Sequence, residues 1–312
     1  MSESKRRWLP YLAFVALAII WGFSFYFIKL GVADMSPSVL VFVRSAAGTV
    51  GLGVIMRAMG RPLLGENWRS NLVPFTTMAV LNAVVPWTAI AWGEQHISSG
   101  LASILNATAA LWTAILIFWV IPSERPSPLN YLGVLIGIAG VALLVLPDLR
   151  SNGLGGSFFG LLAVLAAALS YAVAALYQRT KLRGLSVYEM SFGQTLATSV
   201  LALPIAAPTL PHLHFAVASF LGVVFLGVFA TGVAYLLYYY VMNTLGAVRA
   251  VAVTLVVPVT ALFWGVLLLR ESLSVPMIAG MIVILAGIVL TNIKRRSRTV
   301  PAAEREPDTA AA

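Results

Sequence analysis

The chain has 312 residues, of which 60% are hydrophobic and only 10% are charged, whereas soluble domains carry about 25% charged residues. So little charge excludes an ordinary soluble enzyme and a disordered chain. The net charge of +9 does not indicate a nucleic-acid partner, because the basic residues stand in small groups between long apolar runs. No cysteine is present, which excludes disulfides, thiolate metal sites and cysteine nucleophiles.

Apolar runs of about 20 residues recur along the chain, which is the helix length needed to cross the ~30 Å hydrocarbon core of a membrane. Charges, prolines and Asn/Gly clusters separate these runs. They predict an all-α integral membrane protein with ten transmembrane helices and no room for a soluble domain. The predicted helices are Pro10–Gly31, Pro37–Met56, Leu72–Trp92, Ser99–Ile121, Leu129–Leu146, Ser157–Tyr177, Val187–Ala207, Ala216–Tyr240, Gly246–Leu269 and Val275–Ile293.

The seventh and eighth predicted helices have the least defined limits, because no Asp, Glu, Lys or Arg occurs between Met190 and Val248. We separate these two helices at the three prolines between residues 204 and 211. We end the eighth helix before the Asn243–Gly246 cluster. Boundaries drawn in this way are accurate to about four residues.

The basic residues predict the orientation of the helices, because Lys and Arg concentrate in cytoplasmic loops. With residues 1–9 in the cytoplasm, 16 of the 20 Lys and Arg residues fall on the inner side, 3 fall on the outer side, and Arg44 lies within a helix. The basic start resembles a signal peptide, but the apolar run is too long and lacks a cleavage site, so we interpret it as a retained anchor. An even helix number also places the basic, disordered tail, residues 294–312, inside.

An internal repeat connects the two halves of the chain. A shift of 147 residues brings the fourth and fifth predicted helices onto the ninth and tenth. Apolar, Gly-rich helices resemble one another through composition alone, but several coincidences at one offset favour a duplication. The coincident pairs are Glu124 with Glu271, Gly133 with Gly280, and Gly140 with Gly287.

The repeat predicts two five-helix halves, residues 10–147 and 157–293, joined by an outer linker at residues 148–156. Because five is odd, the second half enters the membrane from the opposite side. Two halves of opposite topology, related by a pseudo-twofold axis, are typical of secondary transporters that bind substrate near the midplane.

Several segments together resemble the drug/metabolite transporter superfamily, and within it the ten-helix EamA-type transporters. The resemblance runs from about Trp8 to Arg296 and rests on the order and spacing of loose motifs. These motifs are WGFSFYFIK, FVRSAAG, LNAVVPWTAIAWGEQHISSGLASILNATAALWTAILIFWVIPSERPS and GAVRAVAVTLVVPVTALFWGVLLLRESLS. The chain departs from a symmetric pattern at Pro258, because the matching position in the first half is Leu111.

The resemblance implies a secondary transporter of the inner (plasma) membrane that moves small organic solutes by alternating access, usually outward. Amino acids and related metabolites are the commonest substrates that it implies. It also implies a cavity lined by the first four helices of each half, with the fifth and tenth helices outside the cavity.

Arg44 is the one clearly intramembrane charge of the predicted helices. A charge at this depth costs about 2.5–3.5 kcal/mol on insertion scales, so it should face a partner or a wet cavity. A guanidinium pairs bidentately with a carboxylate or a phosphate, which makes Arg44 a candidate for binding such a group on the substrate. A fixed ion pair with Asp34 or Glu94, or hydrogen bonds to backbone carbonyls, is the structural alternative.

Aromatic and polar residues within the predicted cavity helices complete the predicted substrate site. Aromatic walls suit amphipathic or aromatic solutes, and amides or hydroxyls in lipid surroundings need partners. Lipid-facing positions, packing and hydrogen bonds between helices are the alternatives for each residue. The predicted residues, besides Arg44, are Trp21, Asn82, Trp87, Asn106, Trp112, Tyr171, Gln194, Tyr235, Tyr239 and Thr254.

Two carboxylates at opposite membrane margins, Glu94 and Glu189, are candidates for proton coupling if they are buried; a solvated helix end is the commoner setting for such residues. Glu124 and Glu271 are interpreted as structural. The small-residue pattern from Gly133 indicates close helix packing within the bundle, with a homodimer seam as the alternative. We expect a monomer or a weak homodimer.

The sequence offers no cofactor or metal site and no P-loop, and His212 and His214 are too few for a catalytic metal site. A multidrug efflux carrier is the alternative function, but it predicts an accessible midplane carboxylate that we do not find. An intramembrane enzyme would need a catalytic dyad or triad, and none is present.

Overall fold

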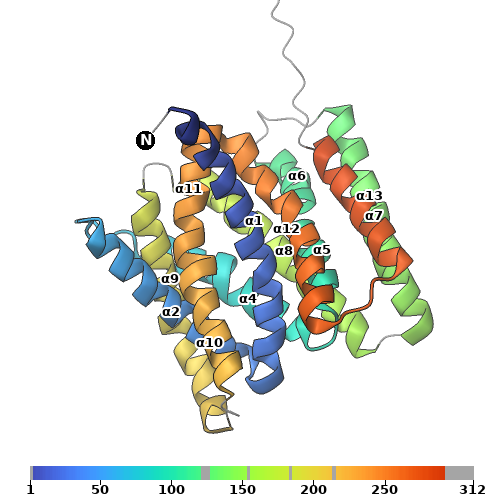
Figure 1. Cartoon of the computed structure of the whole chain (residues 1–312), viewed down its shortest axis with the longest axis horizontal. Coiled ribbons are helices and arrows are strands. Elements are labelled where there is room, and N and C mark those ends of the chain that lie inside the picture. Colours follow the sequence, from blue (N-terminus) through green and yellow to red (C-terminus); the bar gives the residue numbers. More distant parts are fainter. Residues whose placement is uncertain (1–2, 121–126, 153–154, 183–184, 213–215, 292–312) are drawn as a thin grey trace, which may run out of the picture.

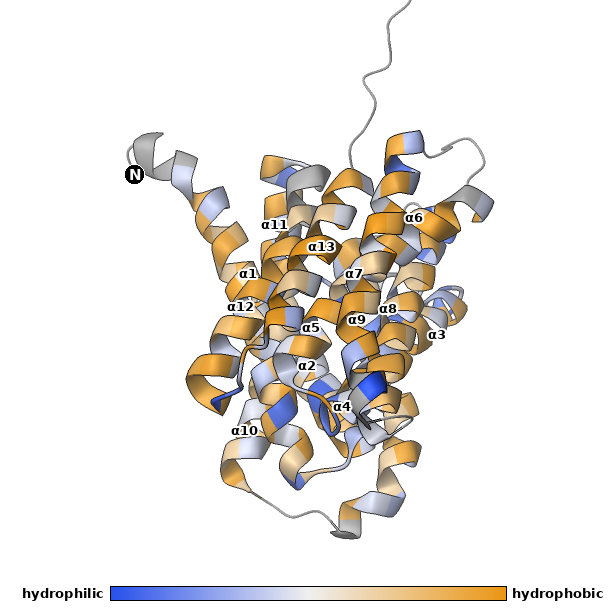
Figure 2. Cartoon of the chain, turned by 90° about the vertical axis from the view of Figure 1, so that its right-hand side faces the viewer, coloured by the Kyte–Doolittle hydropathy of each residue, from blue (hydrophilic) through white to orange (hydrophobic). Residues whose placement is uncertain are grey.

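The computed structural model describes residues 3–120, 127–152, 155–182, 185–212 and 216–291, and within these ranges the chain forms helices and no strands (Figure 1). Hydrophobic residues cover most of the length of the helices (Figure 2). The elements are α1 Glu3–Asp34, α2 Pro37–Ala58, α3 Leu72–Ala79, η1 Val80–Val84, α4 Val85–Glu94, α5 Ser99–Ala107, α6 Ala109–Val120, α7 Pro128–Asn152, α8 Gly156–Lys181, α9 Val187–Ala206, η2 Ala207–His212, α10 Val217–Phe225, η3 Leu226–Val233, α11 Ala234–Leu245, α12 Ala247–Leu269 and α13 Val275–Thr291.

Nine helical runs in the described ranges are long and apolar enough to cross a membrane. They correspond to the first nine predicted helices. The tenth candidate, α13, has 17 described residues and is a shorter apolar helix. The chain is thus a multi-pass membrane protein, and the count of ten crossings stays a prediction.

Local signals in the sequence explain where several helices begin and end. Ser36 accepts a hydrogen bond from the backbone N–H of Val39, and Pro37 occupies the first turn of α2, where its missing N–H costs nothing. Ser98 caps α5 in the same way. Between α11 and α12, Gly246 adopts φ 88°, a conformation that favours glycine.

Two of the membrane-spanning runs contain a π-helical segment, at corresponding positions of the two halves. The segment η1 precedes Pro86 in the third run, and η3 lies in the eighth run, 147 residues further on. Pro86 has no N–H and would clash with the carbonyl of Asn82 in a regular helix, which accounts for the wider turn of η1. No proline lies in η3.

The fourth and ninth runs differ in a way that the prolines alone do not predict. The fourth run breaks at Thr108, between α5 and α6, although it has no proline there. The ninth run, α12, continues through Pro258. The helix is therefore not broken at Pro258, a position where the two halves differ in sequence.

The helices α7 and α13 pack closely against each other at one side of the bundle (Figure 1). A Cβ atom on Gly133 would lie 2.7 Å from the carbonyl oxygen of Gly287, and one on Gly140 would lie 2.8 Å from the backbone nitrogen of Ile284 and 3.1 Å from the carbonyl oxygen of Gly280. Only glycine allows the two backbones to come this close. The small-residue pattern therefore serves packing within the chain.

The contacts between the first and second halves are reciprocal, because equivalent helices of each half make equivalent contacts with the other. The helix α1 of the first half packs on α10, α11 and α12, and α8 of the second half packs on α4, α5 and α6. The helix α2 packs on α9, its counterpart. The first helix of each half is thus surrounded by the third and fourth runs of the other half.

Candidate functional site

Arg44 lies in the middle of α2 with only 8% of its surface exposed. Its guanidinium carbon is 3.9 Å from the centre of the Trp87 ring on α4, a cation–π contact worth about 2 kcal/mol where water is excluded. Gly227 of η3 packs directly against the backbone of Arg44 and fixes α2 at this level.

The predicted alternative of a fixed ion pair for Arg44 is not found. Asp34 instead accepts a hydrogen bond from the hydroxyl of Ser219. Both carboxylate oxygens of Glu94 have no hydrogen-bond partner, and neither does Nε of Arg44. The guanidinium therefore keeps hydrogen-bonding capacity for another molecule.

A chain of hydrogen bonds joins three predicted site residues from three elements. The amide of Asn82 in η1 donates to the Gln194 side-chain oxygen over 3.3 Å, and the Gln194 amide donates to the Tyr235 hydroxyl over 3.3 Å. Gln194 lies on α9 and is 3% exposed. Tyr235 lies in the first turn of α11, directly after η3.

Tyr171 on α8 joins this group from a further helix, because it packs with Trp87 in one apolar cluster. The hydroxyls of Tyr171 and Tyr235 both lie close enough to Arg44 to interact electrostatically with it. The structure thus brings Arg44 and five other predicted residues from both halves together, and we call this group of six the central cluster. Its members are Arg44, Asn82, Trp87, Tyr171, Gln194 and Tyr235.

Side chains from the opposite half bind the carbonyls of both π-helical segments. The Trp21 indole on α1 donates to the carbonyl of Ala230 in η3 over 3.2 Å. The Ser170 hydroxyl on α8 donates to the carbonyl of Leu81 in η1 over 2.7 Å. A π-helical turn is often found at functional sites, and here each one flanks the central cluster. Trp21 therefore positions η3.

The remaining predicted substrate residues lie outside the central cluster. Asn106, near the break between α5 and α6, has a buried side-chain oxygen without a partner. Trp112 is half-buried on α6, and Thr254 is exposed on α12. The side chain of Tyr239 lies outside the described residues.

The two coupling candidates have different environments. Glu94, at the end of α4, is completely buried, so the expectation of a solvated helix end is wrong for this residue. Its burial arises from packing against α1 and α8, which residues next to it in sequence do not reveal. Glu189 is half-buried at the start of α9 and accepts a 3.2 Å hydrogen bond from Asn71.

The turn between α4 and α5 is held from two directions. The Lys29 amino group on α1 donates to the carbonyls of Glu94 and Ile97, the latter over 2.9 Å. Glu271, from the second half, accepts hydrogen bonds from the Ser99 N–H at 2.8 Å, the Ser99 hydroxyl at 3.0 Å and the Gly100 N–H at 3.2 Å. A carboxylate at a helix N-terminus is stabilising, which agrees with the structural role predicted for Glu271. Its repeat partner, Glu124, lies outside the described residues.

Replacing Glu271 with glutamine is expected to destabilise the protein by roughly 1–3 kcal/mol, because an amide loses the charge-assisted bonds to the α5 N-terminus. The measurement is the thermal unfolding temperature in detergent. The matched control is Glu66→Gln at an exposed carboxylate, which should have almost no effect. Equal unfolding temperatures for the two variants would contradict the assignment.

Sequence reasoning missed two contributors to this region. The sequence marks Lys29 only as an outer-side charge, and it gives no signal for Ser170. Both act on backbone carbonyls of other helices, and no local motif indicates such a role. The position of Lys29 near the end of a long apolar helix is the one feature that could have drawn attention to it.

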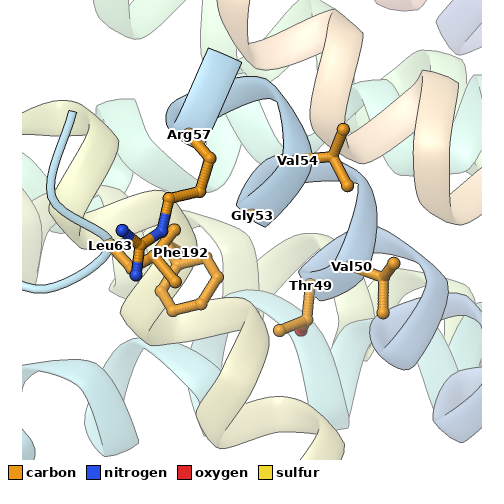
Figure 3. Close-up of a pocket in the computed structure, with 7 residues that line it drawn as sticks. All are labelled: Thr49, Val50, Gly53, Val54, Arg57, Leu63 and Phe192. Atoms are coloured by element: carbon orange, nitrogen blue, oxygen red, sulfur yellow. The ribbon is translucent and has the colours of Figure 1, made fainter. Parts of the chain in front are cut away.

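A separate groove of about 500 Å³ lies between α2 and α9 and opens at the surface (Figure 3). It contains none of the predicted site residues. In Figure 3 the Arg57 side chain points toward Phe192 at one end of the groove. The lining residues are Thr49, Val50, Gly53, Val54, Arg57, Leu63 and Phe192.

No group of three or more His, Asp or Glu side chains suited to a metal ion occurs in the part of the chain that the structure describes. The arrangement around Arg44 instead combines a buried cation, aromatic rings and amide groups. Such a mixture suits recognition of a small organic anion or zwitterion by hydrogen bonds and stacking.

Comparison with known proteins gives one family and several relatives. The model of the EamA-like transporter family matches residues 8–146 and 158–293. The uncharacterized transporter YoaV of Bacillus subtilis is 25% identical over 294 residues, covering 93% of this chain and 98% of YoaV. The uncharacterized inner membrane transporter YedA of Escherichia coli K12 is 28% identical and covers 92% of each chain.

A solved structure titled "Crystal structure of protein" has a similar fold. Its TM-score is 0.64 at 20% sequence identity, and the match covers 93% of this chain and 97% of the solved chain. At this identity the likeness concerns the fold alone.

Proposed function

We propose a function from one premise: the chain belongs to the EamA-like transporter family. It is a multi-pass membrane protein and a transporter rather than an enzyme. We propose that it is a secondary transporter of the inner membrane that exports amino acids or related metabolites by alternating access, and that it acts as a monomer or a weak homodimer.

The proposed architecture has ten crossings in two inverted five-helix halves with both termini in the cytoplasm. The family model matches two segments of similar length, which supports a duplication. The glycine contacts support a pseudo-twofold axis, because Gly133 meets Gly287 while Gly140 meets Gly280, and the partners are exchanged by the 147-residue offset. The start of α1 and the end of α13 lie at the same end of the bundle (Figure 1), as an even number of crossings requires.

The observation that carries the substrate proposal is the buried Arg44 guanidinium, stacked on Trp87 and without an acidic partner. Burying a cation without a hydrogen-bonded counter-charge costs several kcal/mol, so a substrate carboxylate is a suitable partner for Arg44. Amino acids offer this group, and Tyr171 and Trp87 offer apolar surface beside it.

Reconstitution into liposomes tests this function. Vesicles loaded with one unlabelled amino acid should accumulate the labelled form by exchange, saturably and only when they contain the protein. A panel of all common amino acids is needed. Empty vesicles and vesicles with the Arg44→Gln variant are the controls. An absence of saturable flux across the whole panel would remove the amino-acid proposal.

We propose that Glu94 rather than Glu189 is the proton-coupling residue, because the Glu94 carboxylate has no hydrogen-bond partner whereas the Glu189 carboxylate accepts a hydrogen bond from Asn71. A pH gradient across the vesicle membrane should drive amino-acid flux through the wild type. Glu94→Gln should abolish the response to the gradient, and Glu189→Gln should retain it. Coupling is refuted if wild-type flux ignores the gradient and both variants stay active.

A further inference from the structure

We propose that Glu94 and Arg44 form the two ends of a binding site for zwitterions, in which Arg44 holds the carboxylate of the substrate and Glu94 holds its ammonium group. This inference rests on the proposed transport of small metabolites and deepens it, because it states which charges the substrate must carry.

The positions of the two groups along α4 support this pairing. Glu94 follows Trp87 by seven residues on one α-helical segment, which is about two turns, so both side chains leave the same face. Arg44 is stacked on the Trp87 ring. The Arg44 guanidinium and the Glu94 carboxylate therefore lie at the same face of α4, and the two groups interact electrostatically.

The spacing suits an α-amino acid. Seven residues of α-helix rise by about 10 Å, and the Glu94 side chain leans toward the N-terminus of α4, which brings it closer to Trp87. An amino acid would accept one hydrogen bond from Arg44 and donate one to Glu94, each about 2.8 Å long. The distance from the guanidinium nitrogen to the carboxylate oxygen would then be roughly 9 Å. A substrate with only one charged group would leave the other end unpaired.

The hydrogen bonding of both groups indicates missing partners. Both Glu94 oxygens are fully buried without a donor, and Nε of Arg44 is buried without an acceptor. Buried polar groups in native proteins are almost always paired, so each exception needs an explanation. One zwitterion would explain both unpaired groups, the Arg44 cation from α2 and the Glu94 carboxylate of α4.

The other charges near Glu94 are already engaged elsewhere. The Lys29 amino group binds the backbone carbonyls of Glu94 and Ile97 rather than the Glu94 carboxylate. Glu271 accepts three hydrogen bonds from the start of α5. Neither group donates a hydrogen bond to the Glu94 carboxylate, which leaves its oxygens to a donor on the substrate.

Competition binding tests the inference. The probes are phenylalanine, leucine and threonine, each compared with its deaminated acid and its decarboxylated amine. Ligand binding is measured as a rise in the unfolding temperature of the purified protein in detergent and as displacement of the labelled amino acid. The wild type should bind at least one amino acid at least about tenfold more tightly than both of its analogues, because each lost contact to a buried charge costs about 1.5–3 kcal/mol.

The variants separate the two ends of the site. Glu94→Gln should weaken binding of the amino acid at least about tenfold and leave the deaminated acid unchanged, whereas Arg44→Gln should weaken the acid and leave the amine unchanged. Glu94→Asp keeps the negative charge and should retain part of the preference for the amino acid over its deaminated acid. This second variant keeps the inference testable if Glu94→Gln does not fold. Glu66→Gln is the matched control.

Three outcomes would overturn the inference. The first is a wild type that binds amino acids and deaminated acids equally well, which leaves the proposed transport intact. The second is a Glu94→Gln variant that keeps its preference for the amino acid but loses the response to a pH gradient, since Glu94 then carries only a proton. The third is a wild type that binds none of the three amino acids; flux of another solute would still support a transporter.

Discussion

Replacing Arg44 with glutamine is expected to reduce amino-acid exchange in liposomes at least about thirtyfold. Truncating one side of a buried, hydrogen-bonded charge contact costs about 2–5 kcal/mol, and the variant removes the only cation of the central cluster. Arg44→Lys should not restore exchange, because an ammonium group keeps the charge but loses the planar stacking on Trp87 and the bidentate geometry. Initial rates of labelled amino-acid uptake by exchange provide the measurement.

The matched control for Arg44 is Arg57→Gln. Arg57 lies on the same helix but is exposed at the edge of the groove between α2 and α9, so its loss should leave exchange within about twofold of the wild type. The unfolding temperature of each variant shows whether a loss of transport reflects misfolding. A folded Arg44→Gln variant that transports at the wild-type rate would remove Arg44 from the substrate site.

Replacing Gly287 with alanine is expected to destabilise the protein by roughly 1–3 kcal/mol, the usual cost of overpacking a tight contact. The new Cβ would lie 2.6 Å from both the Gly133 carbonyl oxygen and the Gly137 nitrogen, so α7 and α13 must separate. Gly287→Leu adds a much larger side chain at the same point and should prevent folding. Thermal unfolding in detergent and the yield of monodisperse protein give the readout.

Gly232→Ala is the control for this prediction. It adds the same methyl group within the bundle, but its nearest neighbours in other elements lie 3.8 Å away, so the loss of stability should be small. If the two halves are related as proposed, Gly140→Ala should resemble Gly287→Ala, because the offset exchanges these positions. A Gly287→Ala variant as stable as Gly232→Ala would show that the close contact between α7 and α13 is absent.

The parts of the fold that depend on local chemistry were predictable from the sequence. The runs of apolar residues located nine membrane-spanning helical runs, and Pro86, a residue type that disturbs a helix, lies just after η1. The position of η3 was not predictable, because no proline marks it and its shape depends on packing against α2 and α1. The break at Thr108 and the continuity through Pro258 show the same dependence on neighbouring helices.

The candidate site was predictable in its residue types and less so in its arrangement. The position of Arg44 inside an apolar run singled it out, and five other predicted residues lie around it. The burial of Glu94 was missed because the local sequence WGEQH looks like any helix end. Its environment is created by Lys29, which is 65 residues away in sequence, and by the first turn of α5, which is bound by Glu271 of the second half.

The tethered turn between α4 and α5 has a consequence for the resting population of the carrier. Five hydrogen bonds hold this turn: Lys29 donates two of them, and the Glu271 carboxylate accepts three from the start of α5. The position equivalent to Lys29 in the second half is Leu176, whose side chain has no hydrogen-bond donor. If the halves exchange conformations, the two ends of the molecule therefore open at unequal cost. A difference of about 1.4 kcal/mol between the two conformations corresponds to a tenfold difference in their populations. The substrate-free protein would then be mainly in the conformation that is closed at the Lys29 end.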